Sequence, residues 1–302
     1  MQDIITDFYK RFTHEDGIAE KYSCPASVCI FGSGKNSCPE VGLRLSFGAE
    51  AAFRTRSDGR LVLSRSDSDT ITSINKINFP VPNIADWAAE IINAIMRLSS
   101  KPEGIQMLLH TDVGIPELAP RVLCAVAAAA KLADTEMPLQ SILRSAKYPA
   151  YYTAALLSKG RVSVSNIQTL DYLAYNLDLK GKKIITTKIN TRRKRPDFPE
   201  IYNEHEKERI SKATACLEMG YTDQLGLLMQ DASQDMLRRH PDKKAEQLLN
   251  IILDYSPSVR ILPDYSGAVV FVNDNNVDSF IMLVGDKYEK KAGTRPAFYI
   301  SD

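Results

Sequence analysis

The spacing of apolar residues along the chain predicts a mixture of helices and strands. Apolar positions recur every three or four residues, as one face of a helix requires, over 2–12, 85–98, 121–133, 201–220, 223–240, 243–255 and 276–293. Shorter apolar or alternating runs predict strands at 26–31, 104–113, 160–167, 182–190, 267–273 and 297–301. Gly220 follows the fourth of these helices and is expected to end it.

A hairpin and a fold class follow from this order of elements. The segment 41–66 alternates apolar and polar residues around Asp58-Gly59, and because Asp-Gly suits a tight turn, we expect a β-hairpin there. Strands and helices mix without strict strand–helix–strand alternation, which favours an α+β fold of two lobes. We place the boundary after Pro149, with an N-terminal lobe over 1–149 and a C-terminal lobe over 150–302.

Composition and charge narrow the class of protein. Of 302 residues, 44% are hydrophobic and 25% are charged, which is typical of a soluble globular protein. The formal net charge of +1 gives no electrostatic reason to expect a nucleic acid or a membrane surface as partner. The basic run at 191–195 has no aromatic residues between its charges and is interpreted as a solvated loop. No apolar run approaches the ~20 residues of a membrane span.

The cysteines and histidines indicate neither a disulfide framework nor a metal site. Five cysteines include no Cys-x-x-Cys pair, and none of the four histidines stands at zinc spacing from a cysteine pair. The N-terminal segment is charged within its first three residues and does not resemble a secretory signal. We therefore expect a cytoplasmic protein with reduced thiols and no bound metal.

The stretch Cys29-Ile-Phe-Gly-Ser-Gly-Lys-Asn-Ser37 superficially resembles a phosphate-binding P-loop. That loop needs a glycine five positions before its Gly-Lys pair, but Cys29 stands there. It also needs Ser or Thr after the lysine to hold magnesium, but Asn36 follows Lys35. We interpret the stretch as a turn whose glycines supply unusual backbone angles.

Seven stretches resemble, in order, motifs of one known family. They are "SCPASVCIFGSGKN", "RSDGRLVLSRS", "DWAAEIINAI", "GIQMLLHTDVGI", "IYNEHEKER", "LGLLMQDAS" and "SGAVVFVN" with the following "YEKKAGTRPAFYIS". Through these stretches the chain resembles the galactokinases, members of the small-molecule kinase superfamily that includes homoserine, mevalonate and phosphomevalonate kinases (GHMP kinases). The stretch "IYNEHEKER", for example, is similar to the family's Tyr-Asn-x-Arg-Arg helix. The resemblance implies a two-lobe GHMP-kinase-like fold with a cleft between the lobes.

The same resemblance implies that the catalytic residues are lost. The family's arginine falls on Ser27, its Glu-His pair on Ser33 and Gly34, and its sugar-binding aspartate on Asn36. The family's catalytic aspartate falls near Tyr151. Its Gly- and Ser-rich phosphate loop is replaced by "GIPELAPRVLCAV", where two prolines lack the N–H groups that would bind phosphate. No catalytic residue is therefore expected to be retained.

Few binding positions match the family. Tyr202 matches a tyrosine that lines the sugar pocket, although a half-buried tyrosine at a helix start is the plainer interpretation. Trp87 matches a position near the adenine side of the cleft, or it is a core residue of an apolar helix face. Gly32 and Gly267 match turn glycines, Gly267 within the family's second glycine cluster beside the cofactor.

Two functions remain open at this point. The first is an inactive galactokinase-like protein, a pseudoenzyme that binds a small sugar in the cleft or a protein partner. The second is an active Mg·ATP-dependent kinase of galactose or another small sugar or alcohol with a rebuilt site. The second function would require Lys35, Asn36, Arg121 and Asp171 to converge on one pocket, with Lys35 holding phosphate and Asp171 acting as the base.

Overall fold

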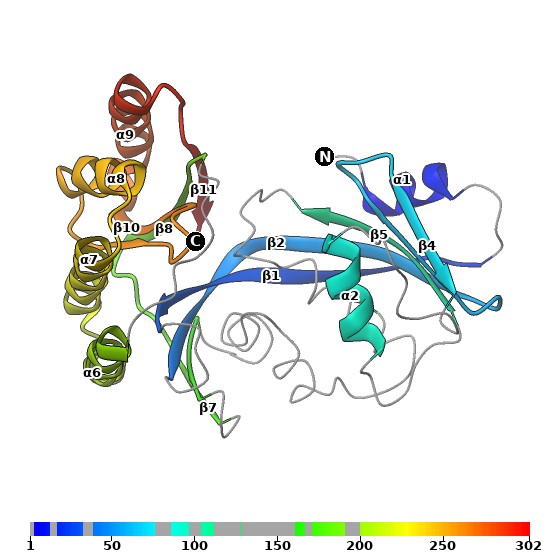
Figure 1. The fold of residues 1–302 in the computed structure, drawn as a ribbon, viewed down its shortest axis with the longest axis horizontal. Coiled ribbons are helices and arrows are strands. Elements are labelled where there is room, and N and C mark those ends of the chain that lie inside the picture. Colours follow the sequence, from blue (N-terminus) through cyan, green and yellow to red (C-terminus); the bar gives the residue numbers. More distant parts are fainter. Residues whose placement is uncertain are drawn as a thin grey trace.

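The computed structural model describes residues 3–12, 17–32, 39–75, 86–96, 104–111, 128, 161–166, 171–190 and 200–302. These residues form two β-sheets and a group of helices, and the predicted α+β class is confirmed (Figure 1). The helices are α1 (Ile4–Arg11), α2 (Asp86–Met96), α6 (Glu200–Met219), α7 (Thr222–Arg239), α8 (Lys243–Leu253) and α9 (Val277–Ala292). The helix predicted at 121–133 lies outside the described residues except for Ala128, which is helical.

The first sheet has seven strands, in the order β4-β3-β5-β2-β6-β7, with β1 also paired to β2. Its strands are β1 (Glu20–Phe31), β2 (Glu40–Arg56), β3 (Arg60–Arg65), β4 (Ile71–Asn75), β5 (Gly104–Thr111), β6 (Val162–Ser165) and β7 (Tyr172–Tyr175). The long strand β2 pairs with β5 through Ala49–Arg56 and with β6 through Glu40–Leu43. The first sheet thus includes β6 and β7, whose residues come after position 150.

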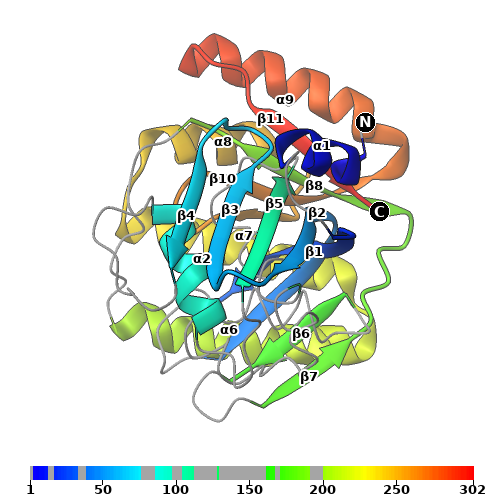
Figure 2. The same ribbon diagram turned by 90° about the vertical axis from the view of Figure 1, so that its right-hand side faces the viewer.

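The predicted hairpin between β2 and β3 is wrong, because β5 lies between these two strands (Figure 2). The Asp-Gly turn itself exists: Gly59 has φ of +71°, and the Asp58 carboxylate accepts the Arg60 N–H at 3.1 Å. However, β5 pairs antiparallel with β2 and parallel with β3. A Cβ on Gly104 would come within 2.9 Å of the carbonyl oxygens of Arg56 and Arg60, so a glycine lets β5 enter between them.

The second sheet is antiparallel, with the order β11-β8-β10-β9. Its strands are β8 (Lys182–Lys188), β9 (Val259–Ile261), β10 (Gly267–Asn273) and β11 (Ala297–Ser301). Helices α6 to α9 lie on the same side of the molecule as this sheet (Figure 1). Gly220 and Gly293 follow α6 and α9 with φ of +69° and +75°, so the predicted end of α6 at Gly220 is confirmed.

Two large apolar cores hold the sheets and helices together. One joins β1, β2 and β6 to α6, α7 and the near face of β8 and β10, and includes Phe31, Leu43, Met229 and Phe271. The other packs the opposite face of β8 and β10 against α8 and α9, and includes Ile185, Leu248, Val270 and Phe280. The first core therefore connects the two sheets. None of the described helices is long and apolar enough to cross a membrane.

Candidate functional site

One face of the first sheet is polar where β1, β2 and β6 run side by side. Ser27 pairs with Arg44, Cys29 with Gly42, and Glu40 with Ser165. Residues directly opposite each other in an antiparallel pair point to the same face, and residues two apart along a strand share that face. We call this surface, formed by Ser27, Cys29, Glu40, Gly42, Arg44, Arg161, Ser163 and Ser165, the polar face.

The opposite face explains why these polar residues lie together. Val28, Val41, Leu43 and Val162 alternate with them and pack in the core shared with α6 and α7. Because strand side chains alternate, burying the valines and leucines against the helices turns the serines and Glu40 to the other side. Most of the polar face is nevertheless buried: Ser27 and Glu40 are each 2% exposed, and Ser163 is fully covered.

Two hydroxyl groups on this face stand out because they are buried without hydrogen bonds. Ser163 Oγ and Ser165 Oγ are buried, and neither has a hydrogen-bond partner in the part of the chain that the structure describes. A buried hydroxyl without a partner costs about 1–3 kcal/mol. A bound water or a ligand in contact with this face would supply the missing hydrogen bonds.

Replacing Ser163 with alanine should therefore leave the free energy of unfolding unchanged or raise it by up to about 1 kcal/mol, because the variant loses only an unsatisfied hydroxyl. Ser64→Ala is the matched control. Ser64 is also fully buried, but its Oγ accepts a hydrogen bond from Arg11 at 2.7 Å and donates to the Thr70 carbonyl at 3.2 Å. Ser64→Ala should cost about 1–3 kcal/mol in urea unfolding. Equal losses in both variants would contradict this account of Ser163.

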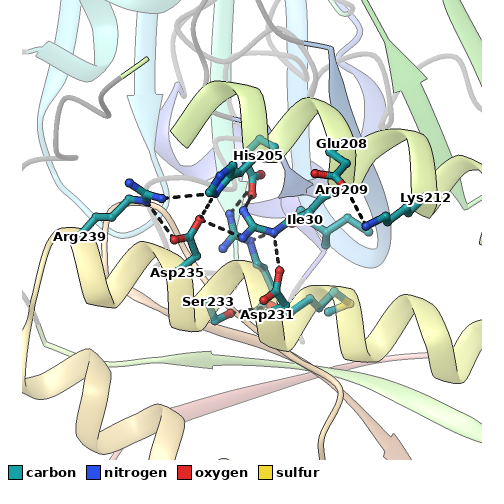
Figure 3. A network of polar contacts seen from close by, with 12 residues as sticks. Ile30, His205, Glu208, Arg209, Lys212, Asp231, Ser233, Asp235 and Arg239 are labelled. Atoms are coloured by element: carbon teal, nitrogen blue, oxygen red, sulfur yellow. Dashed lines mark hydrogen bonds and ion pairs between the residues drawn. The ribbon is translucent and has the colours of Figure 1, made fainter. Parts of the chain in front are cut away.

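A network of charged residues holds the end of β1, where the predicted turn begins (Figure 3). The carboxylate of Glu206, in α6, is fully buried and accepts the backbone N–H of Gly32 at 2.7 Å. Arg260, in β9, is also fully buried and donates from Nε to the carbonyl of Ile30 at 2.8 Å. Its Nη2 lies 3.7 Å from Glu206 Oε2. Two opposite buried charges from the C-terminal half of the chain thus hold the backbone of Ile30 and Gly32, at the end of β1 and just beyond it.

Arg209 lies at the centre of this network. It donates to Glu206 at 2.9 Å, to Asp235 at 2.9 Å and to Asp231 at 2.7 Å. Asp235 also accepts a hydrogen bond from Arg239 Nε at 2.9 Å and lies 3.3 Å from His205 Nδ1 (Figure 3). These contacts tie α6 to α7.

The network sets the charge state of its members. Burial opposes ionisation of Asp235, but hydrogen bonds from Arg209 and His205 outweigh it and lower the pKa of Asp235. Burial likewise opposes the charge of Arg209, and its hydrogen bonds to Asp231 and Asp235 raise its pKa above the usual value. These side chains therefore form charged pairs, and their arrangement suits a structural role better than proton transfer.

The structure places some of the residues predicted from the sequence and leaves others untested. Ser27 lies buried on the polar face, and its assignment to the family's arginine position stays a prediction. Gly32 directly follows β1 with φ of +125°, as expected of a turn glycine. Trp87 lies in α2 and Tyr202 in α6, but their side chains are outside the described residues, so their roles stay predictions. Gly267 begins β10, where a Cβ would come within 1.7 Å of the Thr187 carbonyl oxygen.

Of the four residues that an active kinase would need to bring together, the structure describes only Asp171. Asp171 is exposed just before β7, and its backbone carbonyl accepts the N–H of Asn166 at 2.8 Å. Lys35, Asn36, Arg121 and Tyr151 lie outside the described residues, so their positions relative to Asp171 stay predictions.

Sequence patterns do not predict the charged network. "EHEKER" has the composition of a solvent-exposed helix face, and only Glu206 and Arg209 of this run are buried. Their partners Asp235 and Arg260 lie far along the chain. One signal in the sequence could have pointed to Glu206. The resemblance to the family's Tyr-Asn-x-Arg-Arg helix would put Glu206 at the position of the second arginine. An acidic residue in place of a basic one requires a new partner.

Comparison with known proteins defines the fold. No protein-family model matches the chain, and no curated protein matches it. Among solved structures, galactokinase from Lactococcus lactis in complex with galactose matches with a TM-score of 0.83 at 14% identity, covering 99% of this chain and 97% of that chain. Mevalonate kinase from Methanococcus jannaschii has a TM-score of 0.64 at 12% identity, covering 95% of this chain and 98% of that chain.

Homoserine kinase from Cytophaga hutchinsonii matches similarly, with a TM-score of 0.62 at 14% identity, covering 96% of both chains. The protein therefore has the fold of the GHMP kinase superfamily. The two-lobe GHMP-kinase-like fold predicted from the sequence is confirmed.

Proposed function

We propose that this protein is a galactokinase-like pseudoenzyme: it binds a small hydroxylated ligand, such as a sugar, and transfers no phosphoryl group. The observation that carries the proposal is the place of Ser27. At the family's arginine position the chain has a short neutral side chain, which is 2% exposed on the polar face. Phosphoryl transfer depends on positioning and charge stabilisation, so a lost arginine removes a main contribution to catalysis.

The buried part of the polar face suits hydroxyl groups better than phosphates. It carries Ser27, Ser163 and Ser165, whose hydroxyls can donate to and accept from a sugar, together with the carboxylate of Glu40. Among the described residues no cluster of His, Cys, Asp and Glu could hold a metal ion. The three serines and Glu40 offer no positive charge to the phosphates of a Mg·ATP complex, which carry several negative charges.

The proposal is tested by calorimetric titration with Mg·ATP and then with galactose, followed by an assay for ADP release. We expect no ADP release above the rate without protein, and no heat of Mg·ATP binding. Galactose, or another sugar from a panel, should bind, and Ser163→Ala should weaken binding about fivefold to tenfold through loss of one hydrogen bond. Ser73→Ala, at an exposed position of β4, is the matched control. Galactose-dependent ADP release would refute the proposal.

One observation favours the second candidate, an active small-molecule kinase with a rebuilt site. Arg44 pairs with Ser27 across β1 and β2 and points to the same face, so a guanidinium group lies one strand away from the family's arginine position. Arg44→Gln separates the two candidates. An active kinase would lose nearly all ADP release in this variant, whereas the pseudoenzyme has none to lose.

A further inference from the structure

A cavity opens at the end of the polar face that lies nearest the second sheet. Its volume is about 530 Å³, within the range of roughly 300–1,000 Å³ that is typical of small-molecule sites. Polar and charged residues of its lining come from four separate segments of the chain: Arg44, Ser46, Arg161, Asn176, Asp178 and Asp302. The N–H of Ser46 donates to Ser301 Oγ at 2.7 Å, which ties β2 to β11 beside the cavity.

Two arginines line this cavity, Arg44 in β2 and Arg161 directly before β6. The backbone N–H of Arg44 donates to the carbonyl of Arg161 at 2.7 Å, so the two residues are fixed side by side. Arg161 Nη1 is buried and, among the described residues, has no hydrogen-bond partner. A buried guanidinium N–H without an acceptor is unfavourable, and its planar fork matches the two oxygens of a phosphate or carboxylate.

Two acidic residues also line the cavity, and both have partners of their own. Asp302 pairs with Lys183, whose Nζ lies 2.6 Å from Asp302 Oδ1 and 3.9 Å from Asp274 Oδ1. The hydrogen bond from Lys183, followed by the charge of Arg161, lowers the pKa of Asp302. Asp178 is the remaining carboxylate, and its Oδ1 accepts the backbone N–H of Lys180 at 2.9 Å. The lining thus carries two arginines and two aspartates, and Asp302 is already paired with Lys183. The group that favours an anion is Arg161 Nη1, which is buried and has no hydrogen-bond partner in the described part of the chain.

We propose that this cavity binds a small organic oxyanion, with Arg161 and Arg44 holding its phosphate or carboxylate group. Leu45, Leu177 and Pro25 complete the lining and would contact the carbon skeleton of such a ligand. The site is separate from the buried hydroxyls of Ser163 and Ser165. It depends neither on a bound sugar nor on phosphoryl transfer, so it stands independently of the proposed function.

The test measures the melting temperature and the dissociation constant of the full chain with inorganic phosphate and, separately, with succinate. Sodium chloride at matched ionic strength is the reference. At least one of the two anions should raise the melting temperature of the wild-type protein, and the better ligand shows whether the site prefers phosphate or carboxylate. Arg161→Gln should weaken binding at least about tenfold, because it removes a charge-assisted hydrogen-bond donor.

Arg60→Gln is the matched control, since Arg60 is an exposed residue at the start of β3 and the variant loses the same charge. It should bind as the wild type does. Asp178→Asn should tighten binding about twofold to fivefold, because it removes a like charge from the cavity. If circular dichroism shows that Arg161→Gln does not fold, the gain of affinity in Asp178→Asn still tests the proposal.

Three results would overturn the proposal. One is that neither anion raises the melting temperature of the wild-type protein above its value in sodium chloride. Another is that Arg60→Gln and Arg161→Gln lose affinity equally, as a general effect of charge would cause. The third is an unchanged affinity in Asp178→Asn. Galactose-dependent ADP release would refute the pseudoenzyme but leave this site intact if phosphate binding still requires Arg161.

Discussion

Replacing Arg209 with methionine should destabilise the protein by about 3–5 kcal/mol, because it leaves buried carboxylates without their main cation. Arg209 is 7% exposed, and it contacts Glu206, which is fully covered, and Asp235, which is 3% exposed. Urea unfolding followed by circular dichroism measures the loss. Lys212→Met is the control, since Lys212 and Glu208 form an exposed pair on the same helix, with side chains 60% and 66% exposed. It should change stability by less than about 0.5 kcal/mol.

The pH dependence of stability offers an independent check of this network. Because the pKa of Asp235 is lowered in the folded protein, its stabilising contribution is fully present above the unfolded value of about 3.9. That contribution is lost as the pH falls further, through the folded pKa. The wild-type protein should therefore lose stability steeply below about pH 4, and Asp235→Asn should show a shallower loss. Parallel acid profiles would mean that Asp235 is not held as an anion by Arg209.

Replacing Gly267 with alanine should cost about 3 kcal/mol or more, whether or not any ligand is present. A Cβ at this position would lie 1.7 Å from the Thr187 carbonyl oxygen and 3.2 Å from the Lys188 Cα. Gly267 pairs with Lys188 at the point where β10 meets β8, so the clash involves backbone atoms in the middle of the sheet. The strands must move apart, and overpacking of this kind typically costs 1–3 kcal/mol or more.

Gly285→Ala is the matched control for Gly267. A Cβ on Gly285 would also be close to another atom, at 2.9 Å, but that atom is Nη2 of Arg295, the end of a flexible side chain. Arg295 can move, and alanine favours a helix over glycine by up to about 1 kcal/mol. We expect Gly285→Ala to unfold at the same or a higher urea concentration than the wild type. A tolerated Gly267→Ala would contradict the packing argument and direct attention back to a ligand at Gly267.

Sequence patterns predicted the elements with strong periodicity. Helices α7, α8 and α9 and strands β8, β10 and β11 lie where apolar spacing indicated them. Three short strands were missed: β4, β7 and β9. Strand β9 has only three residues, and β7 is largely exposed, so neither shows the alternation on which a prediction depends. The hairpin error has a different cause, since a turn signal reports local geometry and not which strand lies alongside.

The candidate site was predictable only where the resemblance named a position. Ser27 was expected at the family's arginine position, and its place on the polar face was then given by pairing with β2. The unsatisfied hydroxyls of Ser163 and Ser165 could not be foreseen, because satisfaction of a hydrogen bond depends on neighbours from other strands. The contact of Glu206 with Gly32 is equally invisible in the sequence, since it joins residues from opposite halves of the chain.

The insertion of β5 between β2 and β3 has a consequence for folding kinetics. The turn at Gly59 cannot close a local hairpin, so β2 and β3 come together only after β5, from much later in the chain, pairs with both. The segment between β4 and β5, which includes α2, must first bring its two ends together. Closing a loop of this kind costs entropy before its contacts form. Pairing between distant segments slows folding, and the first sheet should therefore form later than the local helix pair α6 and α7.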